Sequence, residues 1–241
     1  MRKRLTSEVQ VILNSAASIN FDDPIREALQ INYFGAVRIL DLAHECEQLI
    51  ALHHVSTAFV NSNLPNNSVV TEEVLPWIGG EDWENWIDSL IKMEPQMLER
   101  EEPGILKKFG FPNTYTLTKN LAEQAFKKKR HPNLRLSISR PAIVTATQKY
   151  PFPGWADSIA AGGAVIYCLG MGISSRDLVY EHVTGAFIPC DYVVNTILVA
   201  AAVSAARPTP GFDVYHGSPS GIARDYMQGQ FFTKSHEFLE Y

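Results

Sequence analysis

The sequence predicts an α/β fold in which a parallel β-sheet is flanked by helices. Three observations support this: apolar runs of strand length recur, helical patterns lie between them, and small or polar residues follow the runs. Strands joined by helical connections of this length pair in parallel through right-handed crossovers. A chain of 241 residues, 46% of them hydrophobic, has ample length for the core of one large domain.

The first strand is expected at Val9–Leu13, because small polar residues follow this apolar run. A helix is expected from Pro24, since proline favours a first helical turn, and its apolar pattern is interrupted near Gly35. The remaining elements, in chain order, are a strand at Leu49–Val55, a helix that opens near Thr114, and strands at Leu134–Ser139 and Phe212–His216.

Between about residues 62 and 112 the alternation stops, and a helical insertion is expected at the carboxyl edge of the sheet. Trp83, Trp86 and Ile87 begin a run of apolar residues at roughly helical spacing. Insertions at this edge often shape substrate sites, because open parallel sheets bind ligands beyond the carboxyl ends of their strands. We nevertheless expect the tryptophans to be packing anchors rather than ligand contacts.

The composition narrows the class of protein. A formal net charge of -5 argues against nucleic acid as the main partner. The three cysteines, Cys46, Cys168 and Cys190, lack the spacing of a zinc site and are expected to be buried, reduced thiols; no metal site is predicted. Since no apolar stretch reads as a transmembrane helix or a secretory signal, the sequence predicts an intracellular protein that does not span a membrane.

Tyr115 and Lys119 lie four residues apart at the start of a predicted helix, so their side chains share one helical face. An unperturbed tyrosine titrates near pH 10, and a neighbouring ammonium group would lower that pKa by stabilising the phenolate. Tyr115 is therefore a candidate general acid. Taken alone, the Tyr115/Lys119 pair fits a solvated helix face better than a catalytic site. A catalytic role therefore has to be supported by the neighbouring sequence motifs.

Three neighbouring sequence features are expected to lie close to this pair in the fold. The second predicted strand is followed by the hydroxyl residues Ser56 and Thr57 at the carboxyl edge of the sheet. The helix of Tyr115 follows the next long loop, and the strand after it ends near Arg140. A hydroxyl and a phenol could both bind one carbonyl oxygen here.

At these positions the chain resembles the extended short-chain dehydrogenase/reductase superfamily, and more narrowly the fatty acyl-CoA reductases, the male-sterility-protein group. The matching blocks occur in the family's order: Asn14–Phe21, His54–Asn61, Pro112–Lys119 with Ala122 and Glu123, Ser139–Val144, Pro153–Trp155 and Ile188–Asn195. Several blocks in order are far more specific than the Tyr115/Lys119 pair. The resemblance implies a Rossmann-like NAD(P)-binding domain over residues 1–241, with an extended substrate region from about residue 150.

The resemblance implies three catalytic residues. Tyr115 would donate the proton to the substrate oxygen, Lys119 would lower the pKa of Tyr115 and hold the nicotinamide ribose, and Thr57 would hydrogen-bond the developing oxyanion. The implied cofactor-binding residues are Asn14, Ser15, Ala16, Ala17, Ser56, Tyr115, Lys119, Pro141, Ala142, Ile143 and Val144.

Three other positions are expected to be structural. Ser56 would support the strand end in addition to lying near the cofactor. Asn32 falls where the family often keeps a helix asparagine, and a structural role is at least as well supported there. Asp191 would organise a helix start, since aspartate is a good cap.

The implied chemistry is two hydride transfers from NADPH to a fatty acyl-CoA, giving first an aldehyde and then a primary alcohol. Family membership also implies peripheral association with the endoplasmic reticulum or peroxisome surface. The basic run Lys127–Arg130 could attract coenzyme A phosphates, but cations near a helix C-terminus favourably meet the helix dipole, and we favour that second interpretation.

One feature departs from the family. These enzymes begin with a strand, a glycine-rich turn and a helix that binds the cofactor pyrophosphate, and no such turn precedes Asn14. The sequence therefore resembles the C-terminal part of a Rossmann-like domain, and by itself it is expected to bind NADPH weakly or not at all. Three alternatives stay open: a thioester reductase of carrier-protein synthetases, a sugar-nucleotide enzyme, and a truncated, non-catalytic remnant.

Overall fold

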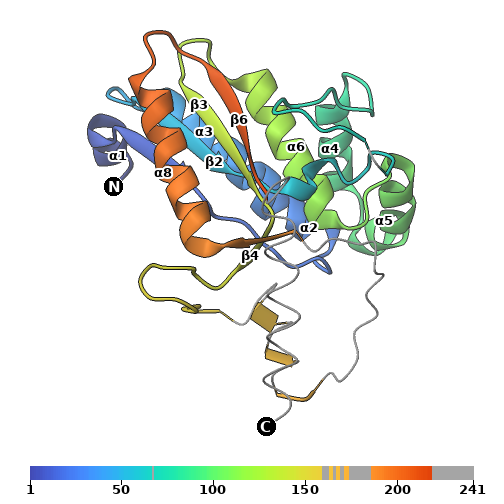
Figure 1. The fold of residues 1–241 in the computed structure, drawn as a ribbon. Helices are drawn as coiled ribbons and strands as arrows, with labels where there is room; N and C mark the ends of the chain where they lie inside the picture. Colours follow the sequence, from blue (N-terminus) through green and yellow to red (C-terminus); the bar gives the residue numbers. More distant parts are fainter. Residues whose placement is uncertain (67, 159–162, 165–166, 169–170, 174–185, 219–241) are drawn as a thin grey trace. The chain divides into compact units, whose positions relative to one another are not determined.

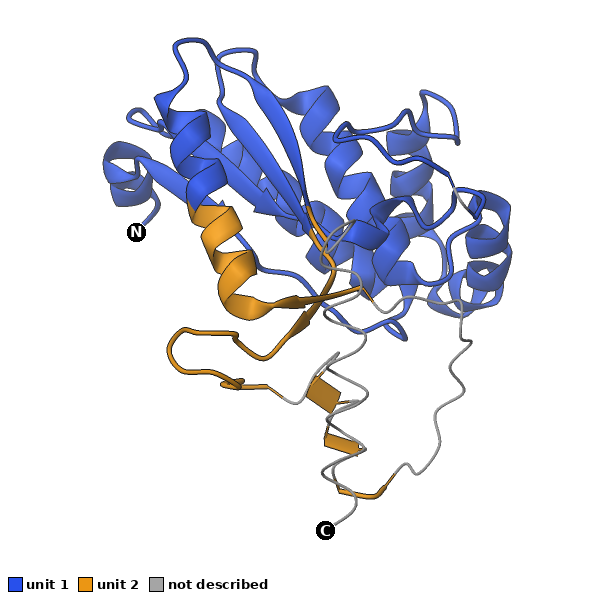
Figure 2. Cartoon of the chain, viewed as in Figure 1, with its two compact units in different colours: residues 1–140, 199–216 blue, residues 141–198, 217–241 orange. Residues whose placement is uncertain are grey.

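The computed structural model describes the chain except for residues 67, 159–162, 165–166, 169–170, 174–185 and 219–241 (Figure 1). The expected substrate region beyond residue 150 is thus described only in part. Two compact units emerge, one of residues 1–140 and 199–216 and the other of residues 141–198 and 217–241 (Figure 2). Each unit is described by itself below.

A four-stranded sheet forms the centre of the first unit. Its strands are β1 (Val11–Asn14), β2 (Ala51–Val55), β3 (Leu136–Pro141) and β6 (Phe212–Gly217), in the order β1-β2-β3-β6 (Figure 1). β1 pairs with β2 and β2 with β3, both in parallel. The predicted parallel sheet is confirmed, with strand bounds within two residues of those expected.

The connection between β1 and β2 is helical but not uniform. α2 (Ile25–Ala28) leads into a π-helical turn, η1 (Leu29–Tyr33), and then into α3 (Phe34–Glu45). The expected interruption near Gly35 is this π-helical turn, which ends two residues earlier. Such turns place one extra residue in the helix and are frequent at functional sites.

α6 (Thr114–Lys129) connects the insertion to β3. Asn113 caps its first turn, because the side-chain Oδ1 accepts a hydrogen bond from the backbone N of Thr116 at 2.9 Å. α3 and α6 pack on one face of the sheet (Figure 1). The core between them consists of Ala36, Leu40, Ala43, Leu52, Val74, Ala122, Phe126, Leu134, Leu136, Ile138 and Val214.

The insertion contains η2 (Ala58–Asn61), α4 (Trp83–Lys92) and α5 (Pro95–Phe109). α4 and α5 share a second apolar cluster with α2, η1 and α6, so the insertion packs sideways against these helices. Trp83 is buried in that cluster against Tyr33, and Trp86 packs at its margin. The tryptophans are therefore packing anchors, as predicted.

Two features of the fold differ from the prediction. Residues ahead of β1 form a short helix, α1 (Arg2–Glu8), whose end is tied to the turn after α3 by a hydrogen bond from Glu47 N to Thr6 O at 2.8 Å. All three cysteines are described and carry free thiols, but each is half-buried rather than fully buried.

The second unit contains a small parallel pair of strands, β4 (Ile143–Thr145) and β5 (Phe187–Pro189). β5 leads directly into α8 (Cys190–Ala206), and the boundary between the units falls within this helix. In the described part of the chain, no helix is long and apolar enough to cross a membrane.

Candidate active site

The site lies where β2 ends and α6 begins. Lys119, on α6, donates from Nζ to the carbonyl oxygen of Val55, the last residue of β2, at 2.7 Å. One residue further along α6, Asn120 Nδ2 donates to the Val60 carbonyl at 3.0 Å. These two bonds hold the helix against the segment that carries Ser56 and Thr57.

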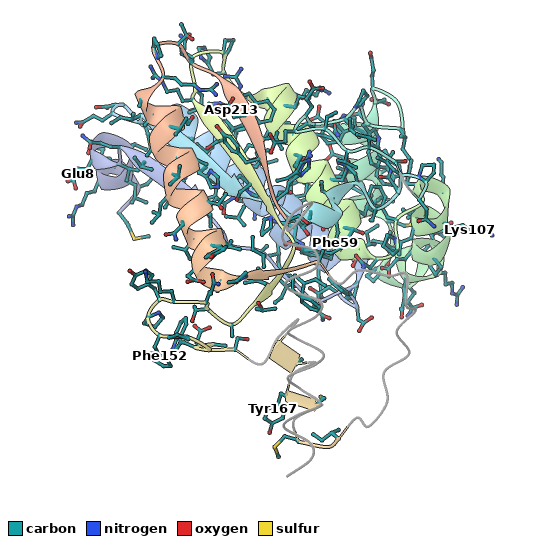
Figure 3. The ribbon with its side chains drawn as sticks, viewed as in Figure 1. Glu8, Phe59, Lys107, Phe152, Tyr167 and Asp213 are labelled. Carbon is teal, nitrogen blue, oxygen red and sulfur yellow. The ribbon has the colours of Figure 1, made fainter. Side chains whose placement is uncertain are left out.

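Two hydroxyl groups meet at this edge. The Thr57 side chain favours the phenolate of Tyr115 and so acts to lower the pKa of the Tyr115 hydroxyl. The Thr57 side chain also caps η2, since its Oγ1 accepts a hydrogen bond from the backbone N of Phe59 at 3.3 Å; Phe59 is labelled in Figure 3. The Tyr115 ring lies against Phe21, with ring centroids 5.4 Å apart. The structure therefore brings together the phenol and the hydroxyl that the sequence predicted to share a carbonyl oxygen.

The electrostatics of the tyrosine differ from the prediction. Burial raises the pKa of Tyr115 above its usual value of 10.0, and the Thr57 side chain only partly opposes this shift. The predicted net lowering is not found in this state, because burial outweighs the contribution that favours the phenolate. The phenol is thus a fully protonated donor at neutral pH.

Lys119 itself is strongly perturbed. Only 2% of the residue is exposed, and burial lowers its pKa from 10.5 to about 8, although the carboxylate of Glu123 opposes the shift. A buried lysine with a strongly lowered pKa, one helical turn from Tyr115, marks a candidate functional site.

The predicted cofactor residues at the end of β1 lie at the same edge of the sheet. Asn14 is buried and pairs in register with His54, whereas Ser15 and Ala16 are exposed and Ala17 is half-buried. Small side chains at a strand end permit close approach of a dinucleotide. Ser56 does support the strand end, because its backbone N donates to the Ser139 carbonyl at 2.7 Å, while its buried Oγ lacks a partner.

Asn32 ties two parts of the site together. Its Oδ1 accepts from the backbone N of Ser18 at 2.8 Å, and its Nδ2 donates to the Ser18 carbonyl at 3.2 Å and to Thr118 Oγ1 at 3.1 Å. The π-helical turn places this side chain between the loop after β1 and helix α6. The structural role considered for Asn32 is therefore confirmed.

Comparison with known proteins places the chain in a family. Residues 1–197 match the model of an NAD-binding family described as Male sterility protein. The chain belongs to the male sterility protein family.

Its curated relatives in this family are named as fatty acyl-CoA reductases. "Probable fatty acyl-CoA reductase 5" of Arabidopsis thaliana is 33% identical over 223 residues, which cover 85% of this chain and 45% of that protein. "Fatty acyl-CoA reductase 2" of Homo sapiens is 32% identical over 214 residues, which cover 89% of this chain and 40% of that protein. The chain thus spans less than half the length of these relatives.

Solved structures confirm the Rossmann-like fold. The terminal R domain from the myxalamid PKS-NRPS biosynthetic pathway superimposes with a TM-score of 0.61 at 22% identity, covering 96% of this chain and 49% of that one. RMD from Pseudomonas aeruginosa complexed with NADPH gives a TM-score of 0.55 at 15% identity, covering 94% of this chain and 66% of that one. At these identities the likeness concerns the fold alone.

A buried ion pair connects α6, the helix that carries Tyr115 and Lys119, to β3. Arg140, at the end of β3, donates from Nη2 to Glu123 Oε2 at 2.6 Å and from Nε to Glu123 Oε1 at 3.0 Å, and both residues are almost fully buried. The same guanidinium group reaches the carbonyls of Thr71 and Glu73 at 3.3 and 2.8 Å. The sequence analysis did not assign this pair, although an arginine in an apolar strand was a usable signal.

The predicted residues beyond β3 belong to the second unit. There Ala142 N donates to the Gly217 carbonyl at 2.9 Å, and Ile143 and Val144 pair with β5. Pro141 ends β3. Their role beside a nicotinamide stays a prediction.

Asp191 lies in the first turn of α8, and its role as a cap stays a prediction. Its carboxylate accepts hydrogen bonds from the backbone N of Gln148, Lys149 and Tyr150 at 3.0, 2.9 and 3.3 Å. Burial opposes the charge, yet these donors hold the pKa of Asp191 below its usual value. Asp191 therefore fixes the loop after β4, because three donors converge on one carboxylate.

The basic side chains at the end of α6 form hydrogen bonds and ion pairs with other residues of the chain. Lys127 Nζ donates to the Val74 carbonyl at 2.7 Å, Lys128 and Lys129 both pair with Glu84, and Arg130 reaches the Leu134 carbonyl at 2.7 Å. These contacts join the basic run to other parts of the chain, and its favourable interaction with the helix dipole stays a prediction.

Proposed function

We propose that the protein containing this chain reduces a fatty acyl-CoA to a fatty alcohol through an aldehyde, using NADPH, and that Tyr115, Thr57 and Lys119 form its proton-donor site. One observation carries the proposal: the Thr57 side chain acts on the Tyr115 hydroxyl and lowers its pKa, and the buried Lys119 lies one helical turn further along α6. Two hydroxyl donors that meet at one point can both bind a single carbonyl oxygen.

The residues divide the chemistry between them. Thr57 and Tyr115 would hold the substrate oxygen, and Tyr115 would transfer its proton to that oxygen as negative charge develops. Lys119, held by Val55, would keep a positive charge beside the phenol and thereby stabilise the phenolate that remains. Fixed donors of this kind stabilise charge without reorganising during the reaction.

The nicotinamide cofactor would supply the hydride. The residues of this chain fit such a group: small side chains follow β1, the Ser56 hydroxyl is buried without a partner, and Lys119 lies at the same edge. Asn14, Ser15, Ala16 and Ala17 would lie against the dinucleotide. NADPH rather than NADH is proposed from the resemblance to the fatty acyl-CoA reductases, since fold neighbours carry either cofactor.

The substrate class rests on the relatives. Proteins 32–33% identical to this chain carry the name fatty acyl-CoA reductase, whereas thioester-reductase and sugar-nucleotide neighbours at 22% identity or less share the fold. A long-chain acyl-CoA at a surface of the endoplasmic reticulum or peroxisome is accordingly the proposed setting.

The proposal is tested by replacing Thr57 in the complete protein. Thr57→Val removes the hydroxyl at nearly constant volume, and loss of one oxyanion donor lowers turnover by about 10²–10³-fold. Thr57→Ser keeps the hydroxyl and is the matched control. Turnover of palmitoyl-CoA is followed by NADPH oxidation and by product chromatography. Equal turnover by the two variants, or no acyl-CoA reduction by the unmodified protein, contradicts the proposal.

A further inference from the structure

His54 is a buried titratable residue that the proposed chemistry does not use. It lies on β2, one residue before the carbonyl that binds Lys119, and is 1% exposed. Its ring packs against Phe126 of α6, with ring centroids 4.7 Å apart. An imidazole at this position can be charged or neutral, and its charge state matters because Lys119 lies next to it.

The contact between His54 and Asn14 indicates which ring nitrogen carries the proton. His54 Nδ1 lies 3.0 Å from Asn14 Nδ2, across the β1–β2 register. Because an amide nitrogen can only donate, Nδ1 has to accept, and the proton of a neutral ring is then on Nε2. His54 Nε2 is buried and has no hydrogen-bond partner among the residues that the structure describes. No group of the described chain is therefore placed to stabilise an imidazolium.

The surrounding charges also oppose protonation. From α6, His54 faces the ammonium of Lys119; from its own strand it neighbours His53, whose ring nitrogens are bonded to Ser137 and Ser139 at 2.8 and 3.0 Å. The nearest carboxylate on α6, Glu123, is committed to Arg140. Burial first, and then Lys119 and His53, lower the pKa of His54 well below 6.5.

We propose that Asn14 and His54 form a positioning pair, in which the Asn14 amide holds His54 neutral with its proton on Nε2, so that Lys119 carries its charge beside Tyr115 without a second cation next to it. The role assigned to Lys119 rests on the proposed function. An amide serves this purpose and a carboxylate does not, because an aspartate at position 14 would attract a proton to the imidazole.

The pair is tested first without reference to activity. In the purified chain, ¹⁵N-edited NMR of the histidine rings, assigned with His54→Gln, should show a neutral ring protonated on Nε2 from about pH 8 to about pH 6. Asn14→Asp should raise the His54 pKa by at least about one unit, since a buried partner charge commonly shifts a pKa by this much. Asn133→Asp adds the same charge on the surface and should leave His54 unchanged. A ring protonated on Nδ1, an imidazolium at pH 7, or an unshifted pKa in Asn14→Asp overturns the pair.

The second arm tests its role in the complete protein. In Asn14→Asp, kcat/KM for acyl-CoA reduction should acquire an acid limb whose midpoint matches the His54 pKa measured by NMR, and Asn133→Asp should lack it. A shifted pKa without this limb overturns the positioning role while leaving the proposed function intact. Absence of reduction by the unmodified protein overturns the proposed function and with it this role of the pair.

Discussion

The two halves of α6 carry similar charged side chains in opposite surroundings. In the first half, Lys119 is 2% exposed and its partner is the Val55 carbonyl, and just past the midpoint Glu123 is 1% exposed and pairs with Arg140. In the second half, Lys128 and Lys129 reach Glu84 at the surface, with side chains 50% and 35% exposed.

This difference in exposure indicates which part of α6 is positioned by specific polar contacts. A buried charge is costly unless specific partners satisfy it, whereas a solvated ion pair contributes little either way. The first half is therefore held in one arrangement by its polar contacts, and the second half is held by apolar packing. Substitutions in the two parts of α6 test this contrast, and they are given from the largest expected effect to the smallest.

The largest effect on stability is expected from Arg140→Met. The substitution leaves the Glu123 carboxylate buried without its partner, so the free energy of unfolding should fall by about 3–5 kcal/mol. Lys129→Met breaks a surface pair instead and should cost about 0.2–1 kcal/mol. Urea unfolding followed by circular dichroism measures both. Equal losses would remove the contrast between the two halves.

A matched pair of lysine substitutions tests the contrast in activity. Lys119→Met should lower acyl-CoA reduction in the complete protein by about 10²–10⁴-fold, the range typical of groups that assist proton transfer. Lys127→Met, eight residues along the same helix, removes a contact to the Val74 carbonyl and should leave the rate unchanged. Initial rates of NADPH oxidation decide between them, and a similar rate for both variants would argue against Lys119.

The pKa of Lys119 predicts a pH dependence of stability. The folded chain releases this proton near pH 8 and the unfolded chain near 10.5, so between these values the unfolded state binds more protons. The free energy of unfolding should therefore rise with pH through this group, by up to about 1.4 kcal/mol per pH unit. Lys119→Met should lack the rise. Urea midpoints at pH 8 and pH 10 provide the test, and parallel changes in the two proteins would contradict the buried ammonium.

The smallest effect is expected at the surface. Glu84→Gln weakens the contacts to Lys128 and Lys129, and the loss in unfolding free energy should be about 0.2–1 kcal/mol at low salt. Because 1 M salt screens exposed charges, the loss should nearly vanish there. Glu123→Gln, which alters the buried pair, should keep its effect in 1 M salt; a loss that disappears would show that solvent reaches this pair.

Local patterns were sufficient to predict the main elements of the fold. The strands β1, β2, β3 and β6 are apolar runs bounded by polar residues, and α6 follows a clear Asn113 cap. α1 was missed because it buries no residue, so it has no apolar pattern, and its contact to the turn after α3 joins residues far apart in the sequence. The three-residue strands β4 and β5 are too short to give a periodic signal.

The candidate site was predicted as a set of residues, but its electrostatics were not. Spacing placed Tyr115 and Lys119 on one helical face, and the motif order added Thr57. The bond of Lys119 to Val55 joins residues 64 positions apart, and no local pattern reports such a contact. The raised pKa of Tyr115 has the same origin, since it depends on burial by the folded chain.

The central claim is that Tyr115 donates the proton to the substrate oxygen. Its most direct test is Tyr115→Phe in the complete protein, with Tyr33→Phe as the control that removes a hydroxyl from a buried ring in the second apolar cluster. Tyr115→Phe should abolish alcohol formation from palmitoyl-CoA while NADPH affinity stays nearly unchanged, and Tyr33→Phe should retain turnover. Retained turnover in Tyr115→Phe would contradict the assignment.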